Sequence, residues 1–185
     1  MRKRLLAVLV LAGLVAGSGA ARAEPLVSRT LVINEVSTSG VNGELDEFVE
    51  VLNVSQAPQD LTGIALRVFT ASCQVSRTIV LDGPVLLAGE RLVVAGAALS
   101  STVTAEHVLP ANLDLNSRTG GVALASGSKR IDAVAWEAPW SVGCELEGEP
   151  ALAPPPGFSY SITRDVLGTD TDDNRRDFHI DYRSP

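Results

Sequence analysis

The sequence has few of the side chains that most often carry chemistry. It contains two cysteines, two histidines and one methionine in 185 residues. Cys73, Cys144, His107 and His179 are too widely separated in the chain to show the ligand spacing of a zinc site. A Gly-x-Ser-x-Gly nucleophile elbow is also absent. These absences argue against a hydrolase, and we expect that the protein is not an enzyme.

Basic residues are concentrated at the N-terminus. Met-Arg-Lys-Arg opens the chain, an apolar run follows over residues 5–17, and Ala21-Arg22-Ala23 comes next. This order predicts a secretory signal peptide over residues 1–23, cleaved after Ala23. The apolar run is too short to be a comfortable membrane span. We therefore expect a secreted, extracellular protein whose mature chain has no membrane span.

The mature chain has little positive charge. Cleavage after Ala23 would leave 11 basic and 22 acidic side chains, a net charge of −11. Such a surface repels phosphate backbones and anionic lipids. Nucleic acid is therefore not an expected partner.

The length of the mature chain indicates a single domain, and its two cysteines are candidates for a disulfide. Residues 24–185 are enough for one hydrophobic core and few for two. In oxidising surroundings Cys73 and Cys144 are expected to form a disulfide, with two free buried thiols as the alternative. The bridge would close a loop of about 70 residues, which stabilises by roughly 4 kcal/mol in the chain-entropy model.

Short runs of alternating or β-branched apolar residues recur along the chain, bounded by Gly, Pro, Asn, Asp or Ser. Such runs are typical of strands, and no stretch keeps a helical period. Eight strands are predicted at residues 31–36, 47–52, 64–69, 78–81, 91–95, 121–125, 130–136 and 159–163. Residues 137–157 are rich in Pro, Gly and Glu and are expected to form an irregular excursion.

Several of these segments together resemble one known family. They are Ile-Asn-Glu-Val at 33–36, Asp-Glu-Phe-Val-Glu-Val-Leu-Asn at 46–53, Asp-Leu-Thr-Gly-Ile-Ala-Leu at 60–66, the paired runs 121–124 and 131–136, and the closing stretch 161–164 with 169–178. The combination is similar to the bacterial secreted lamin-tail domain. Ile64 stands where that family usually has an aromatic residue.

The resemblance implies an all-β fold, an immunoglobulin-like antiparallel β-sandwich of about eight to nine strands. It also implies a non-catalytic interaction module, the role of this domain in nuclear lamins and in many secreted bacterial proteins. A shared fold does not by itself transfer a partner.

The acidic closing stretch is a candidate cation site. Asp170, Asp172, Asn174 and Asp177 offer oxygen ligands of the kind that Ca²⁺ prefers. The glycine and glutamate that an EF-hand loop requires are missing. The alternative is that these side chains cap their own turn and pair with Arg164, Arg175 or Arg176.

Two further groups have a structural and a functional interpretation. Glu35, Asp46, Glu47 and Glu50 are paired carboxylates that could act as acid and base, but bonds to loop amides are favoured. Trp136 and Trp140 could stack on a sugar ring or a partner, but a core or loop-filling role is favoured, and Trp136 is expected to be buried first.

Three functional hypotheses follow. The first is an extracellular interaction module that binds a protein or an envelope polymer. The second is a structural envelope protein stabilised by Ca²⁺, and the third is an unrecognised extracellular hydrolase, for which Glu50 would be the residue to test.

Overall fold

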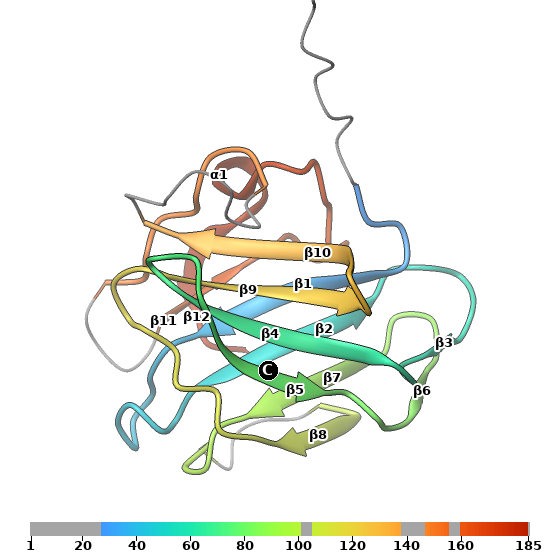
Figure 1. Ribbon diagram of the computed structural model, residues 1–185, viewed down its shortest axis with the longest axis horizontal. Coiled ribbons are helices and arrows are strands. Elements are labelled where there is room, and N and C mark those ends of the chain that lie inside the picture. Colours follow the sequence, from blue (N-terminus) through green and yellow to red (C-terminus); the bar gives the residue numbers. More distant parts are fainter. Residues whose placement is uncertain (1–26, 101–104, 138–146, 156–159, 185) are drawn as a thin grey trace, which may run out of the picture.

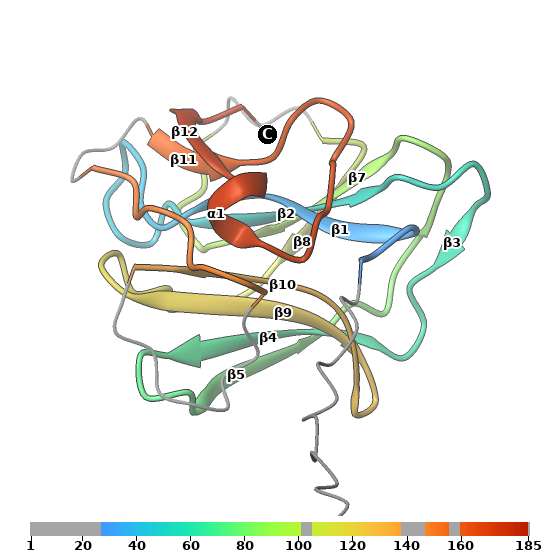
Figure 2. The ribbon, with the colours of Figure 1, turned by 90° about the horizontal axis from the view of Figure 1, so that it is seen from above.

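The computed structural model describes residues 27–100, 105–137, 147–155 and 160–184. These residues form two mainly antiparallel sheets that face each other, with a small two-stranded ribbon at one end (Figures 1 and 2). The architecture is an all-β sandwich, as the sequence predicts. The predicted signal peptide, residues 1–23, lies outside the described residues.

The larger sheet has six strands in the order β12-β11-β1-β2-β7-β8. Neighbouring strands are antiparallel except for β7 and β8, which run parallel. The bounds are β1 Leu31–Ser37, β2 Phe48–Asn53, β7 Arg91–Ala95, β8 His107–Pro110, β11 Tyr160–Thr163 and β12 His179–Tyr182.

The smaller sheet has four strands in the order β10-β9-β4-β5, all antiparallel. Its members are β4 Ile64–Thr70, β5 Val75–Val80, β9 Gly120–Ser126 and β10 Lys129–Trp136. The ribbon pairs β3 Gln59–Asp60 with β6 Val85–Leu86. A short helix, α1 Asn174–Asp177, lies against β10 (Figure 2).

The core lies between the two sheets. Side chains alternate along each strand, so Val49 and Val51 of β2 point into this core. Phe48 points to the opposite face, where it packs with Val93 and Ala95 under a loop. Every residue of β2 is therefore buried, because loops cover the outer face of the larger sheet as well.

Trp136 is fully buried, as expected. Its Nε1 donates a hydrogen bond to the carbonyl of Asn116 at 2.9 Å. The ring lies directly against Gly120, where an added Cβ would fall 2.4 Å from the ring. Only glycine fits opposite this tryptophan.

All eight predicted strands are present, with ends shifted by three residues at most. The described residues contain twelve strands rather than eight or nine, because β3, β6, β8 and β12 were not predicted. These four have two to four residues each, and a strand this short gives a weak pattern, although β11, with four residues, was predicted. The helix α1 was also not predicted, because four residues are too few to show a helical period. No helix among the described residues has the length and apolar character needed to cross a membrane.

The predicted Cys73–Cys144 disulfide involves one described residue and one that is not described. Cys73 lies in the turn between β4 and β5 with a φ of 63°. Cys144, Trp140 and most of the excursion at 137–157 lie outside the described residues. The Cys73–Cys144 bridge therefore stays a prediction.

Candidate functional site

The densest group of charged side chains surrounds Arg164, directly after β11. Its guanidinium is fully buried and donates hydrogen bonds in three directions. Nη2 reaches Asp132 of β10 at 2.9 Å, and Nη1 reaches Asp177 of α1 at 2.8 Å. Nε donates to the carbonyl of Ile33 at 3.0 Å, and Nη1 also donates to that of Thr169 at 2.8 Å. One side chain thus contacts both sheets and the C-terminal loop.

Two further contacts tie this group to the sandwich. The second oxygen of Asp132 accepts a hydrogen bond from the amide of Ile33, which joins β10 to β1. The ring of Phe178 lies against the guanidinium of Arg164, 4.5 Å from carbon to ring centre. A cation over an aromatic face is favourable, particularly away from water. We call Arg164, Asp132, Asp170, Asp177 and Glu147 the Arg164 cluster.

The four residues predicted to bind Ca²⁺ are all bonded to groups of the protein itself, and Asp170 and Asp177 share Arg164. Asp170 accepts from the amides of Ser28 and Asp172. Asp172 also pairs through its carboxylate with Arg130 at 3.3 Å. Asp177 accepts from both the amide and the hydroxyl of Thr171, besides Arg164. The turn-capping interpretation agrees with these contacts, with Arg164 as the principal cation.

The fourth residue, Asn174, closes the edge of the smaller sheet. Its Oδ1 accepts from the amide of Ala135 at 2.8 Å, and its Nδ2 donates to the carbonyl of Ala133 at 2.9 Å. Glu147 accepts from the amide of Ala133 at 2.9 Å, and Ala151 exchanges backbone hydrogen bonds with Ala135 and Glu137. The outward-facing backbone groups of β10 are therefore paired with side chains and with one short segment.

Three carboxylates of the cluster approach one another. Oxygens of Asp132, Glu147 and Asp170 all lie within 4.8 Å of one another. Among the described residues this is the group of carboxylates that could hold a metal ion, but the guanidinium of Arg164 is already bonded to Asp132 and lies 3.5 Å from Asp170. A cation would compete with this buried positive charge. The arrangement suits structural neutralisation better than metal binding.

Burial changes the protonation of this group. Burial, with the negative charges of Asp132 and Asp170, raises the pKa of Glu147. Burial also raises the pKa of Asp132, against the lowering effect of Arg164. Glu147 lies 3.6 Å from Arg130 and 3.8 Å from Arg164, too far for short ionic bonds. Oxygens of Glu147 and Asp132 lie within 4.8 Å of each other, and a proton held on Glu147 reduces the excess of buried negative charge.

The predicted acidic group near β1 and β2 divides into two pairs. Glu47 accepts from the amides of Asp114 and Leu115 at 2.7 and 2.8 Å. Asp46 accepts from the amides of Asn42 and Ser100 at 3.1 and 3.0 Å. Both carboxylates hold loops in place, as the structural interpretation expects.

Glu35 and Glu50 lie opposite each other on β1 and β2. Glu35 accepts from the hydroxyl of Ser161 at 2.6 Å, and Glu50 accepts from Asn34 at 2.7 Å. Glu50 also pairs with Arg91 at 3.2 Å. Burial raises the pKa of both carboxyls. Each is nonetheless fully buried under these partners, so neither is presented to a substrate.

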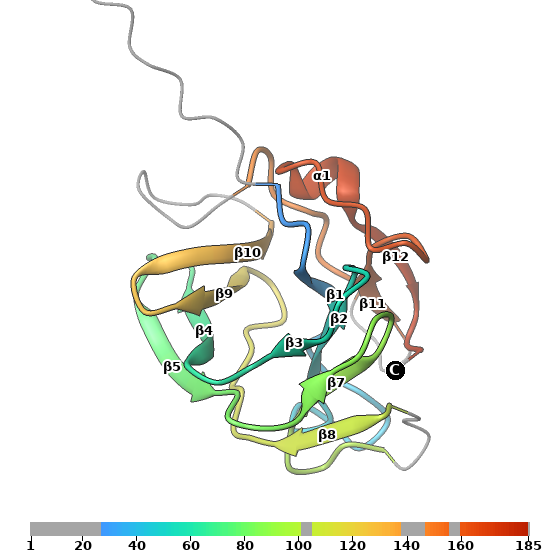
Figure 3. The same cartoon turned by 90° about the vertical axis from the view of Figure 1, so that its right-hand side faces the viewer.

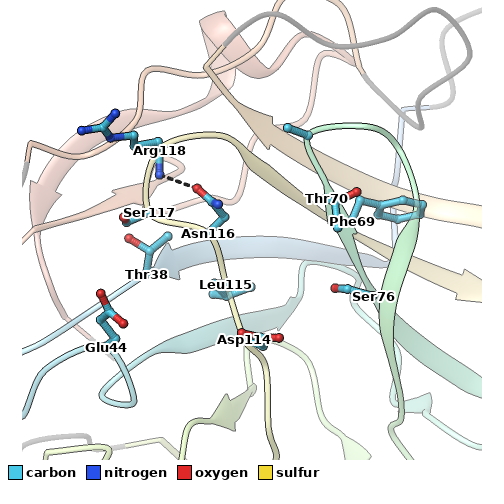
Figure 4. A pocket seen from close by; sticks show the side chains of 11 residues that line it. Thr38, Glu44, Phe69, Thr70, Ser76, Asp114, Leu115, Asn116, Ser117 and Arg118 are labelled. Carbon is cyan, nitrogen blue, oxygen red and sulfur yellow. Dashed lines mark hydrogen bonds between the residues drawn. The ribbon is translucent and has the colours of Figure 1, made fainter.

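A polar cleft of about 450 Å³ lies at one end of the sandwich. Thr38 and Glu44 line it on one side, and Thr70 and Ser76 line it on the other (Figure 4). Asn116 accepts from the amide of Arg118 at 2.9 Å and so shapes its own loop. The ring of Phe69 points away from Asn116 and packs on Ala123 and Ala133 (Figure 4). Phe69 is the one aromatic side chain among the described lining residues, and turned this way its ring offers no platform across the cleft for a sugar ring.

Sequence reasoning missed the contributions of Asp132 and Glu147. The alternation in β10 gave one signal, because Asp132 falls on the same side as Val134 and Trp136 and is therefore directed inward. An inward carboxylate requires a partner. Nothing in the spacing indicates that Arg164, 32 residues later, supplies it.

Comparison of the chain with protein-family models and with curated protein sequences finds no match. The similarity to lamin-tail domains therefore continues to rest on the residues alone.

Replacing Glu147 by glutamine tests the protonation of the cluster. Folding raises the pKa of the Glu147 carboxyl from its ordinary value of 4.5 to about 10. Between these values the folded wild type keeps a proton on Glu147 that the unfolded chain releases, so its stability falls as pH rises. The glutamine cannot ionise. We expect Glu147→Gln to gain stability over the wild type between pH 5 and pH 8, by up to about 1.4 kcal/mol per pH unit.

Urea denaturation at both pH values measures this difference. Glu149→Gln is the matched control, because Glu149 is exposed and should show no such trend. A Glu147→Gln protein that loses stability relative to the wild type at pH 8 would show that Glu147 acts there as an anion.

Calcium should leave the melting temperature unchanged. The oxygens of Asp170 and Asp177 already accept hydrogen bonds from backbone amides and Arg164. Thermal melts in EDTA and in millimolar CaCl₂ compare the two conditions. A rise of several degrees with CaCl₂ that Asp172→Asn removes would instead establish the predicted cation site.

Proposed function

We propose that the protein is a non-catalytic extracellular interaction module, an immunoglobulin-like sandwich of the lamin-tail type, that binds a protein partner by adding a strand to β5. The proposal is supported by the predicted export and by the resemblance of the sequence to lamin-tail domains. It is also supported by a difference between the two edges of the smaller sheet, of which β10 is covered by other segments and β5 is not paired on its outer side among the described residues. The last observation carries it.

The two edges of the smaller sheet differ in what covers them. At β10 the outward amides and carbonyls are paired with Asn174, Glu147 and Ala151. Among the described residues, no strand pairs with the outer side of β5. Proteins usually protect such edges, because unpaired backbone groups recruit other chains.

The hydrogen-bond pattern identifies the groups that β5 leaves available. The amide of Leu81 donates to the carbonyl of Ile64, so alternate residues of β5, including Ile79, face β4. The backbone groups of Thr78 and Val80 consequently face the open side. Val75 and Val80 are about half exposed, at 50% and 52%. β5 thus offers both backbone groups and apolar side chains.

The edge of the larger sheet at β8 is less suited to strand addition. The amide of Ala111 donates to the carbonyl of Ala95, so Val108 and Pro110 face outward. Pro110 has no amide proton to donate, and proline on an edge strand discourages pairing. β12 has only four residues, against six in β5.

The other two hypotheses have less support. A cation-stabilised envelope protein would need free ligands in the C-terminal loop, where Asp170 and Asp177 are bonded to Arg164 and to amides. A hydrolase would need accessible carboxylates, and Glu35 and Glu50 are buried.

Thr78→Pro tests strand addition at β5. The substitution removes an amide proton on the open side and leaves the bonds to β4 in place, so we expect only a small change in stability. Thr78→Val is the matched control, because it keeps the amide. Immobilised proteins are incubated with cell-surface extract, and captured proteins are quantified by mass spectrometry.

Proteins captured by the wild type and by Thr78→Val should be lost from Thr78→Pro. Equal capture by all three folded proteins, or capture of nothing, would contradict the proposal. Thermal melts of each variant establish that it is folded.

A further inference from the structure

An apolar pocket lies beside the open edge of β5. Its volume is about 370 Å³, and it lies where the chain leaves β5 and passes β8. Figure 3 shows that these two edge strands lie on the same side of the sandwich. Leu81, Leu92 and Leu109 supply its apolar walls. Leu81 and Leu92 are buried core residues, so the pocket opens directly onto the core.

The position of the pocket matches the geometry of an added strand. Ile79 points inward from β5 and packs against the core. A strand paired with Thr78 and Val80 would place alternate side chains on the same face as Ile79. Such a side chain would lie between the two sheets, next to Leu81 and Leu109. Backbone pairing and pocket filling can therefore occur together.

The rim of the pocket is acidic. Asp82 and Glu106 both line it and are exposed. Of the groups that could offset this charge, His107 lines the pocket and lies 3.5 Å from Glu90, and Arg91, whose amide donates to Glu106, pairs with Glu50 at 3.2 Å. The whole chain has a net charge of −7. Complementary charge favours a basic occupant, and a second copy of this acidic chain would be repelled.

We propose that the occupant is an extended basic segment of a partner protein, which inserts one apolar side chain into this pocket between flanking lysines or arginines. This inference rests on the proposed strand addition and specifies the chemistry of the partner. Burying one apolar side chain contributes roughly 1.5–3 kcal/mol, which corresponds to about 10-fold to 100-fold in affinity.

The test uses a phage-displayed library of random 12-residue peptides, panned on the wild-type protein. Enriched peptides are synthesised, and their affinities are measured for the wild type and for variants. Leu109→Lys places a cation in the pocket. The double variant Asp82→Asn, Glu106→Gln removes the two acidic side chains at the rim. Both positions are exposed, so this variant is expected to fold and still tests the proposal if Leu109→Lys does not fold. Thr78→Pro and Thr78→Val report on the edge.

Enriched peptides should combine lysine or arginine with a central apolar residue. We expect affinity to fall at least about 10-fold in Leu109→Lys. The Asp82→Asn, Glu106→Gln protein should bind several-fold more weakly at low salt and equally at high salt, because salt screens exposed charges.

The outcomes separate the two proposals. Peptides that no longer bind Thr78→Pro, but bind Leu109→Lys and the Asp82→Asn, Glu106→Gln protein as tightly as the wild type, would support strand addition. They would contradict the insertion of a basic segment into the pocket. Peptides that bind Thr78→Pro as well as Thr78→Val would contradict strand addition itself. Enrichment of acidic peptides, or of none, would overturn the present inference.

Discussion

The structure depends on one buried arginine. Arg164 joins β11 to Asp132 of β10, to Ile33 of β1 and to Asp177 of α1. Each of these groups would be costly to bury alone, because charges and peptide groups lose their hydration. Together they satisfy one another, and β1 and β11 of the larger sheet, the edge strand β10 of the smaller sheet and the C-terminal loop acquire one fixed arrangement. The acidic residues near the C-terminus, Asp170 and Asp177, therefore have a structural role as partners of Arg164.

The same cluster determines which edge of the smaller sheet remains available. Asn174 and Glu147 pair with the outward backbone groups of β10, and the helix that contains Asn174 is held through Asp177 by Arg164. β5, at the opposite edge, has no such cover among the described residues. In the described part of the chain, β5 is thus the edge strand opposite the cluster, and an apolar pocket lies beside it.

Periodicity predicted the parts of the fold that depend on neighbours in the chain. All eight predicted strands, the inward position of Trp136 and the role of Asp46 and Glu47 in holding loops agree with the prediction. The short strands and α1 depend on pairing with distant segments, which leaves no local pattern. The partners of Arg164 were foreseeable only in part, because Asp177 is near in sequence whereas Asp132 and Ile33 are far away.

Arg164→Met most directly tests the role of this cluster. The methionine fills similar volume without charge, so it leaves Asp132 and Asp177 buried without their cation. Urea denaturation at pH 7 should show a loss of about 3–5 kcal/mol in the free energy of unfolding. Arg176→Met, at an exposed position on α1, should change it by less than about 0.5 kcal/mol. Equal stabilities of the two variants would contradict the account.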